Sequence, residues 1–283
     1  MNSVSQIPYI RNEKKWYILS IYYAKDNWDE LIKKIKNFYQ TRQNQFCNCL
    51  IFFSKERGEN IRAVFITSVN DGNNYSTEIE NYFQKFIVQN PSISKIQFPY
   101  GETIWCNYPN NSLVWNRFKL MNYSDQYIEF HQRTMDLVLN LLKVDISDGA
   151  LFSTGFYLIT KGLYFLNKED RENELSKLHL SIYEDLRDSS EKEIKVKCLI
   201  DKFDIDVIGN TIEMYIDENE KDCSAELTNW LISIKMFLKY CNYRTFSFFT
   251  LNILGLSEFN QIVLTELLNL GYNHYANNLK TLI

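Results

Sequence analysis

The sequence lacks the motifs of the common enzyme classes and has few histidines. Among 283 residues the histidines are His131, His179 and His274. No GxGxxG, Walker, HExxH, GxSxG or DxDxDG pattern occurs. Each histidine is more typical of a satisfied structural residue, and their wide spacing gives no metal-binding pattern. We therefore expect neither classical hydrolase nor nucleotide chemistry, and neither a metal nor a cofactor.

Long apolar runs are also missing. The opening MNSVSQIPYIRNEKKW has no apolar segment of the kind found in signal peptides. The most apolar run, Phe152 to Leu166, is too short to span a membrane and carries Lys161. The 6 cysteines are scattered without CxxC spacing, and we interpret them as reduced thiols. The sequence predicts no membrane span and a cytoplasmic location.

Charge of one sign is not concentrated anywhere. The net charge is −4, and no basic stripe interleaved with aromatics is present, so we expect no nucleic-acid partner. Hydrophobic residues make up 45% of the chain and charged residues 23%, as in an ordinary globular protein. Aromatics reach 15%, with 19 Tyr and 19 Phe. This content suggests a core built on rings and a groove lined by them.

A β-hairpin is predicted from Phe46 to Ser68, FCNCLIFFSKERGENIRAVFITS. Cys49 to Phe53 is a short apolar run, and Ile61 to Ser68 is apolar and β-branched. The residues between them are charged or, at Gly58, conformationally permissive.

One arginine lies inside this hairpin. Side chains alternate along a strand, so Arg62, Val64 and Ile66 share a face. A guanidinium cannot lose its charge, and if that face is covered it needs a carboxylate, carbonyls or an anionic ligand. Two interpretations stay open: an edge arginine whose charged end reaches water, or an anion-binding arginine in a cleft.

The residues around the hairpin predict a β-α-β-β-α-β order from residue 14 to about 100. Trp16 to Tyr23 is a strand candidate, and Asp26 is a candidate N-cap for the helix that follows. After the hairpin, Thr77 and Glu80 form a capping-box pattern at the start of a second helix. Ile93 to Phe98 reads as a fourth strand. This order is the ferredoxin-like, or split βαβ, arrangement.

The segment from Pro99 to Tyr123 changes character and is rich in Pro, Gly, Asn and aromatics. Long connections without periodicity are often functional. Its aromatic and polar residues either line a pocket or pin the loop to the protein body: Trp105, Tyr108, Trp115, Asn116 and Arg117.

The rest of the chain is mainly helical by its spacing. The fold class is therefore α+β: a ferredoxin-like half over residues 1–100, an irregular aromatic connection over 101–124, and a mainly helical half over 125–283 that packs with the first as one unit. Within 192–217, partial alternation suggests a strand pair. The expected helices contain Tyr127 to Leu141, Ala150 to Leu166, Leu175 to Leu186, Ala225 to Cys241, and Ser257 to Leu270, with Ser257 as N-cap.

Four segments resemble a known family, the C-terminal glutamate-elimination domain of lantibiotic dehydratases, which also occurs free-standing as thiopeptide-type bacteriocin biosynthesis proteins. The resemblance spans most of the chain. The segments are WYILSIYYAKDNWDELIKKI, LIFFSKERGENIRAVF, IEFHQRTMDLVLNLL and FSFFTLNILGLSEFNQIVLTELL.

The resemblance implies work on a ribosomally made precursor peptide, leader plus modified core. In this family the domain removes glutamate from glutamylated Ser or Thr, leaving dehydroamino acids, and arginines hold the glutamyl carboxylates. Stand-alone relatives include pyridine synthases, which perform a formal [4+2] cycloaddition between two dehydroalanines. A glutamylating dehydratase subunit or a cyclase would be a partner.

The family's functional positions are only partly retained. Arg62 matches the first arginine of the strand motif, whereas Val64 replaces the second and Asn60 replaces a histidine. In the late segment Asn252 is retained, but Phe248 replaces the histidine implicated in proton transfer. Losing such a residue typically removes a factor of about 10²–10⁴ in rate. Three functions are therefore open for this chain: a lyase that eliminates glutamate, an enzyme for the cycloaddition, or a docking subunit without catalysis.

By this resemblance the candidate site is an aromatic cleft between the two halves. Arg62 and Asn252 are its candidate catalytic residues. Its candidate substrate-binding residues are Glu102, which lies near the position of a family glutamate, Trp105 and Arg117. An unrelated α+β protein with accidental pattern matches is the third interpretation.

Overall fold

The computed structural model describes residues 8–94, 108–115, 124–143, 146–186, 190–217 and 224–281. The chain divides into two compact units, residues 1–132 and 133–283.

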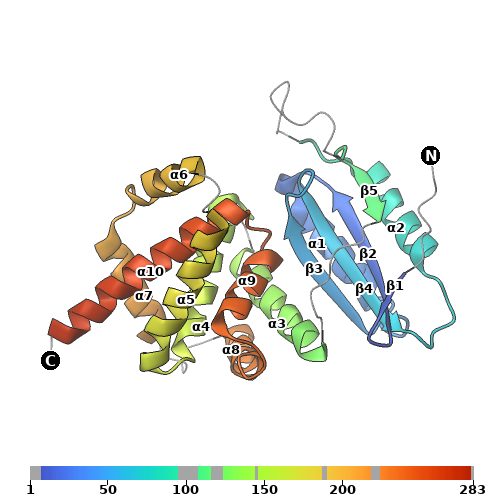
Figure 1. The fold of residues 1–283 in the computed structure, drawn as a ribbon. Coiled ribbons are helices and arrows are strands. Elements are labelled where there is room, and N and C mark those ends of the chain that lie inside the picture. Colours follow the sequence, from blue (N-terminus) through green and yellow to red (C-terminus); the bar gives the residue numbers. More distant parts are fainter. Residues whose placement is uncertain are drawn as a thin grey trace. The chain divides into compact units, whose positions relative to one another are not determined.

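The first unit is built on a five-stranded antiparallel sheet, in which β2, β4 and β3 lie side by side (Figure 1). These are β2 (Lys14–Tyr22), β3 (Asn48–Ser54) and β4 (Asn60–Ser68). The two shorter strands, β1 (Tyr9–Arg11) and β5 (Ser112–Trp115), both pair with β2. The predicted hairpin is thereby confirmed as β3 and β4.

Two helices cover one face of this sheet through aromatic contacts. They are α1 (Trp28–Gln40) and α2 (Ser76–Gln89). The Trp28 ring stacks on Phe53 of β3 with a centroid distance of 5.3 Å. Phe65 of β4 meets Phe38 of α1 at 5.0 Å. The high ring content of the sequence thus forms a core, as predicted, and each such pair adds about 0.5–1.5 kcal/mol beyond its area burial.

Both predicted helix caps in this unit are wrong. Asp26 lies inside a short 3₁₀ helix, η1 (Lys25–Asn27), that precedes α1. The cap residue of α2 is Tyr75, without a side-chain hydrogen bond, and the Ser76 N–H is satisfied by Asn74 Oδ1 at 3.1 Å.

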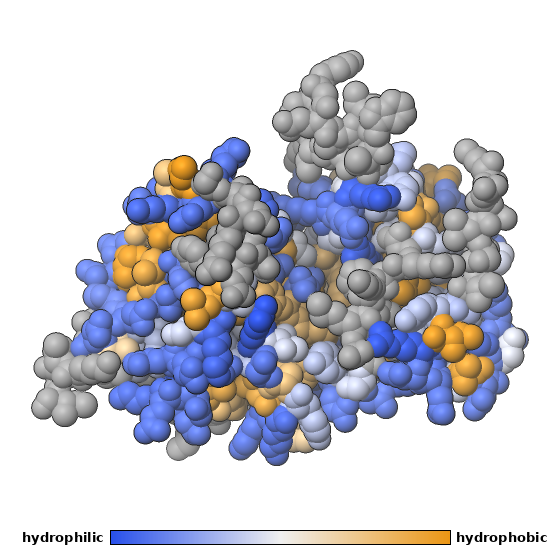
Figure 2. All heavy atoms as spheres, viewed as in Figure 1, coloured by the Kyte–Doolittle hydropathy of each residue, from blue (hydrophilic) through white to orange (hydrophobic). Residues whose placement is uncertain are grey.

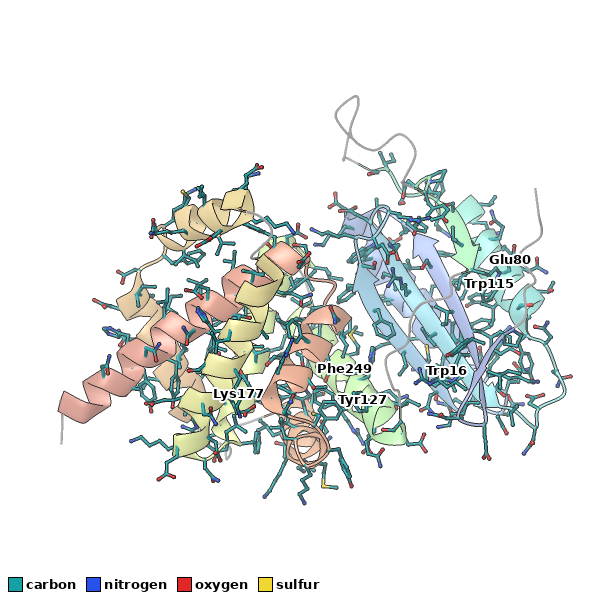
Figure 3. All side chains as sticks on the ribbon, in the orientation of Figure 1. Trp16, Glu80, Trp115, Tyr127, Lys177 and Phe249 are labelled. Atoms are coloured by element: carbon teal, nitrogen blue, oxygen red, sulfur yellow. The ribbon has the colours of Figure 1, made fainter. Side chains whose placement is uncertain are left out.

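Glu80 does not fold back onto the start of α2, as a capping box would require. Its Oε2 accepts a hydrogen bond from Trp115 Nε1 at 3.0 Å, and Figure 3 shows the two side chains together. This bond ties α2 to β5, so a tertiary contact takes the place of the predicted local one.

The ferredoxin-like prediction is confirmed in part. The order β5-β2-β4-β3 is the one that a β-α-β-β-α-β chain forms, but β1 is an addition and the last strand is not where we expected it. Residues 93–94 are not in a strand, and 95–98 lie outside the described residues. Hydrogen bonds from side chains connect the segment before β5 to the segment after α2. Asn110 Nδ2 and Asn111 Nδ2 donate to Ser92 O at 2.9 and 2.8 Å.

The second unit is helical throughout its described residues. The boundary between units falls within α3 (Asp125–Leu141). Three of the predicted helices agree closely with α3, α4 and α8, whereas the helices predicted at Leu175 to Leu186 and Ser257 to Leu270 are longer in the structure, as α5 and α10. The remaining bounds are α4 (Asp148–Tyr164), α5 (Lys168–Leu186), α6 (Ser190–Ile200), α7 (Ile205–Asp217), α8 (Ala225–Phe237), α9 (Tyr243–Ile253) and α10 (Glu258–Thr281).

The strand pair predicted within 192–217 is wrong, because this segment forms α6 and α7. Its alternation is not a true period of two. Val196 and Ile200, four residues apart, are buried, whereas Ile194 is 62% exposed. Burial at every fourth residue is the mark of a helix.

Buried hydrogen bonds connect the helices of the second unit. Trp230 Nε1 of α8 donates to Thr134 Oγ1 of α3 at 3.1 Å. Tyr243 Oη of α9 donates to Ile159 O of α4 at 2.7 Å. Helix α9 was not predicted, although Asn242 caps it by accepting from Thr245 N at 2.8 Å.

On the face drawn in Figure 2, small apolar patches are separated by hydrophilic side chains. Within the described ranges, no helix is both long and apolar enough to cross a membrane.

Candidate anion-binding site at the hairpin turn

Arg62 lies on β4 between Ser20 of β2 and Phe52 of β3, its cross-strand neighbours. Its side chain is only 8% exposed, and its Nη2 donates to the carboxylate of Glu56. Glu56, in the turn that joins β3 to β4, has a side chain that is 66% exposed. In this ion pair the arginine side chain is buried and the glutamate side chain is exposed to solvent. Arg62 is therefore not a solvated edge arginine, and its anion partner here is a carboxylate of the same chain; a role in binding an anionic ligand stays a prediction.

The backbone of the turn is fixed by hydrogen bonds from side chains. Asn60 Nδ2 donates to Glu56 O at 3.1 Å and to Gly58 O at 2.8 Å, and Tyr22 Oη donates to Glu56 O at 3.3 Å. Gly58 has a φ angle of 115°, a backbone conformation that residues with a Cβ atom rarely adopt. Asn60, which stands where the family has a histidine, therefore acts as a support for the turn.

A second arginine of the turn contacts a pair of tyrosines. Arg57 Nη1 donates to Tyr108 Oη at 3.2 Å, and its guanidinium carbon lies 5.6 Å from the centre of the same ring. The rings of Tyr22 and Tyr108 are 5.0 Å apart between centroids. A cation over an aromatic face is attracted to the ring, so Arg57 is held against Tyr108, whose ring packs on that of Tyr22.

The charges of the turn act together on Tyr22. Burial raises the pKa of the Tyr22 phenol above its usual value, and Arg62 opposes this effect. Arg57 also lowers the pKa, while Tyr108 and Glu56 raise it. Two guanidinium groups and one carboxylate thus act on the phenol.

The other predicted site residues belong to other parts of the chain. Glu102, Trp105 and Arg117 lie outside the described residues. Asn252 belongs to the second unit, where it is exposed on α9 and its Oδ1 accepts from Gln261 Nε2 at 3.0 Å.

Phe248, at the position where the resembled family has its late histidine, also lies on α9. Phe248 is half-buried there, and the guanidinium carbon of Arg244 lies 5.7 Å from its ring centre. An aromatic ring cannot transfer a proton as a histidine does, so this position contributes packing and a cation–π contact.

The sequence did not identify Arg57 and Tyr22 as residues of the candidate site. Arg57 was part of a polar turn, and Tyr22 the end of an apolar strand. The strand register places Tyr22 opposite Asn60, next to the turn that contains Arg57. The one available signal was the charged segment KERGE between two apolar strands, which predicts a turn but not its contacts.

The histidines have structural partners. His131 is fully buried on α3, with Nε2 2.8 Å from Ile51 O and its ring 4.3 Å from that of Phe52. Burial lowers the pKa of His131 to about 4, so the ring is neutral near pH 7 and Nε2 donates its hydrogen to the carbonyl. His179 Nδ1 lies 2.7 Å from Glu266 Oε2.

The described residues contain no group of three or more His, Cys, Asp or Glu side chains that could hold a metal ion. Cysteines in these ranges are free thiols: Cys47, Cys49, Cys198 and Cys241.

Neither a protein-family model nor a curated protein matches the sequence. Solved structures do match. A pyridine synthase, TbtD, from thiomuracin biosynthesis has a TM-score of 0.67 and 14% identity, over 93% of this chain and 98% of that one. TsrL has a TM-score of 0.59 and 10% identity, over 93% and 96%. The chain therefore shares its fold with a thiopeptide pyridine synthase, which confirms, for the fold, the resemblance present in the sequence.

Proposed function

We propose that this protein acts in the biosynthesis of a ribosomally made peptide natural product of the thiopeptide or lanthipeptide type, by binding a modified precursor peptide. The observation that carries the proposal is the similarity to TbtD over nearly the whole of both chains. Fold alone does not establish function, so the site residues must add to it. Two arginines at the β3–β4 turn, Arg57 and Arg62, support contact with an anionic group of such a peptide.

Between glutamate elimination and a ring-forming step, the residues favour ring formation. Elimination in the family uses a second arginine on the strand and a late histidine. Here those positions hold Val64, which is fully buried, and Phe248. A [4+2] reaction between two dehydroalanines asks mainly that the two groups be held in register. TbtD, one of the similar structures, is likewise a pyridine synthase.

A second candidate function is a docking subunit without chemistry of its own, serving a glutamylating dehydratase or a cyclase. The same two replacements favour it, because both remove polar groups from positions that are functional in the family. A binding role needs only the peptide contacts, and it would leave the peptide chemically unchanged by this chain.

Mass spectrometry of the precursor peptide, co-expressed with its pathway with and without this protein, separates these functions. We expect that omission stops a late product while dehydration stays intact. Accumulation of glutamylated peptide would instead assign elimination. No change in any peptide species, with the protein present and folded, would contradict a catalytic role, and a pull-down of the precursor would then test the docking subunit.

A further inference from the structure

Helix α8 and the turn that follows it carry an exposed stripe of large apolar side chains. Ile232 is 59% exposed, Met236 49% and Tyr240 60%, and they are four positions apart. The Tyr240 N–H still bonds to Phe237 O, so the helical winding continues as far as the third residue of the stripe. Side chains at this spacing lie on one face of a helix. Single exposed apolar residues are ordinary, whereas a continuous stripe marks an interaction surface.

The α8 stripe lies in a positively charged part of the chain. Lys235 and Lys239 each precede a residue of the stripe, so they line one side of it, and both are exposed. The whole chain has a net charge of −4, yet residues 227–257 contain Lys235, Lys239 and Arg244 and no Asp or Glu. The surface that complements this stripe is therefore apolar with an acidic side.

Helix α7 of the same unit presents such a surface. Val207 is 56% exposed and Met214 59%, and their separation of seven positions places them on one face. Asp206 and Glu213 each precede one of these two residues, and both are exposed. Residues 201–217 contain five acidic residues and one lysine. The α7 stripe, Val207 and Met214 with its acidic side, thus has the opposite charge to the α8 stripe.

The two stripes match when the helices run antiparallel. The residues that precede the stripe on one helix then lie beside those that precede it on the other, so that lysines face carboxylates. Contact of α8 with another α8 would place lysines against lysines, which is unfavourable. Both stripes are exposed within one copy of the chain, so they are not paired with each other there.

We propose that the α8 stripe of one copy of this chain docks antiparallel on the α7 stripe of a second copy. Each copy carries both surfaces, so the contact either closes about a twofold axis, with each α8 on the other copy's α7, or extends into a larger assembly. The proposal concerns self-association of the chain and does not depend on the proposed function.

Sedimentation velocity of the full chain, from micromolar to near-millimolar concentration, tests this contact. We expect weak, concentration-dependent association, because the surface is small. Raising the salt concentration from about 0.05 M to about 0.5 M should increase the Kd by roughly threefold or more, since salt screens exposed charges.

Charge exchange between the two stripes gives the specific result. The double variant Lys235→Glu with Lys239→Glu should weaken association by about tenfold, because attraction becomes repulsion. Asp206→Lys with Glu213→Lys should do the same. An equimolar mixture of the two variants should regain association, since the acidic α8 of one meets the basic α7 of the other. Circular dichroism and the Tm of each variant establish that it is folded.

Matched variants separate the stripes from general surface effects. Met236→Ser should weaken association by roughly three- to tenfold, because an apolar side chain no longer leaves water on docking. Leu180→Ser on α5 makes a similar change at a residue that is 61% exposed and outside both stripes, and should leave the Kd unchanged. Lys33→Glu with Lys85→Glu, on α1 and α2, repeats the change of charge in the first unit and should also have no effect.

A wild-type chain that stays monomeric over this range would overturn the proposal. If that monomer sediments with phosphatidylserine vesicles, the α8 stripe is a lipid-binding face, and if it does not, the stripe is left to a helix of a different protein. Association that persists in the Lys235→Glu, Lys239→Glu variant, or that mixing of the two charge variants does not restore, would equally exclude this pairing of stripes.

Discussion

His131 gives a pH dependence that can be measured at one residue. The ring is fully buried, and burial lowers its pKa to about 4 from the ordinary value of 6.5. Between these values the unfolded chain binds a proton that the folded chain does not, so stability is complete above about pH 6.5 and falls as the pH drops toward 4. We expect this residue to contribute a loss of about 1.4 kcal/mol per pH unit in that window. Urea unfolding between pH 4.5 and 7 measures the slope.

The matched variant for this prediction is His131→Gln. Glutamine can still donate to Ile51 O but does not titrate, so its stability should depend less on pH over the same window. His274→Gln, which removes a half-buried imidazole near Asp206, controls for the loss of an imidazole elsewhere. A slope that persists in His131→Gln, or that His274→Gln removes instead, would contradict the assignment.

The sequence predicted single residues well where local periodicity determines their environment. Alternation along the strand placed Arg62 on one face with Val64, and both are buried. It could not place Glu56, Arg57 and Tyr22 around that guanidinium. Their contacts depend on a strand register and on a turn with two positive φ angles, at Arg57 and Gly58, neither of which has a periodic signature.

Close packing between α4 and α9 depends on a residue without a side chain. A Cβ atom built on Gly162 of α4 would lie 2.2 Å from Phe246 Cε1, and Phe246 is fully buried. Gly162→Ala must therefore displace the ring or separate the helices, and we expect it to destabilise the protein by about 1–3 kcal/mol. Chemical denaturation of the full chain measures this value.

The same helix provides the control. Gly149 lies in the first turn of α4, and a Cβ built there meets nothing within 4 Å. Gly149→Ala should be neutral or stabilising by up to about 1 kcal/mol, because alanine restricts the unfolded chain more than glycine does. Equal destabilisation by both substitutions would show that the clash with Phe246 is not the cause of the effect at Gly162.

Whole elements were predictable where burial follows a clear period. The strands of the hairpin and the helices α3, α4, α5 and α8 follow from their apolar spacing. The errors arose where long-range contacts replaced local ones. Glu80 bonds to Trp115 rather than capping α2, and the last strand of the sheet forms from Ser112–Trp115. In α6, charged residues between apolar ones imitated a strand, although only Val196 and Ile200 of that run are buried.

Over the whole molecule, the backbone arrangement is shared with TbtD, whereas two residues expected to be functional are replaced. The match to TbtD extends over 93% of this chain at 14% identity, so a shared arrangement of the backbone persists with few identical residues. Apolar patterns that specify a core tolerate extensive exchange of similar residues. Catalytic chemistry does not, and Phe248 and Val64 could not perform the acid–base or anion-binding steps of a histidine and an arginine.

The two candidate catalytic residues lie in different units, Arg62 in the first and Asn252 in the second. If both act on one precursor peptide, each should contribute to its binding, and residues without shared partners contribute additively. We expect Asn252→Ala to weaken binding by about threefold to tenfold, as for loss of one hydrogen bond, and Arg62→Lys with Asn252→Ala to weaken it by the product of the single effects. Asn252 is exposed, so its variant should fold normally. Isothermal titration with the precursor peptide gives the Kd values, and an unchanged Kd for Asn252→Ala would restrict the peptide contacts to other residues and remove Asn252 from the site.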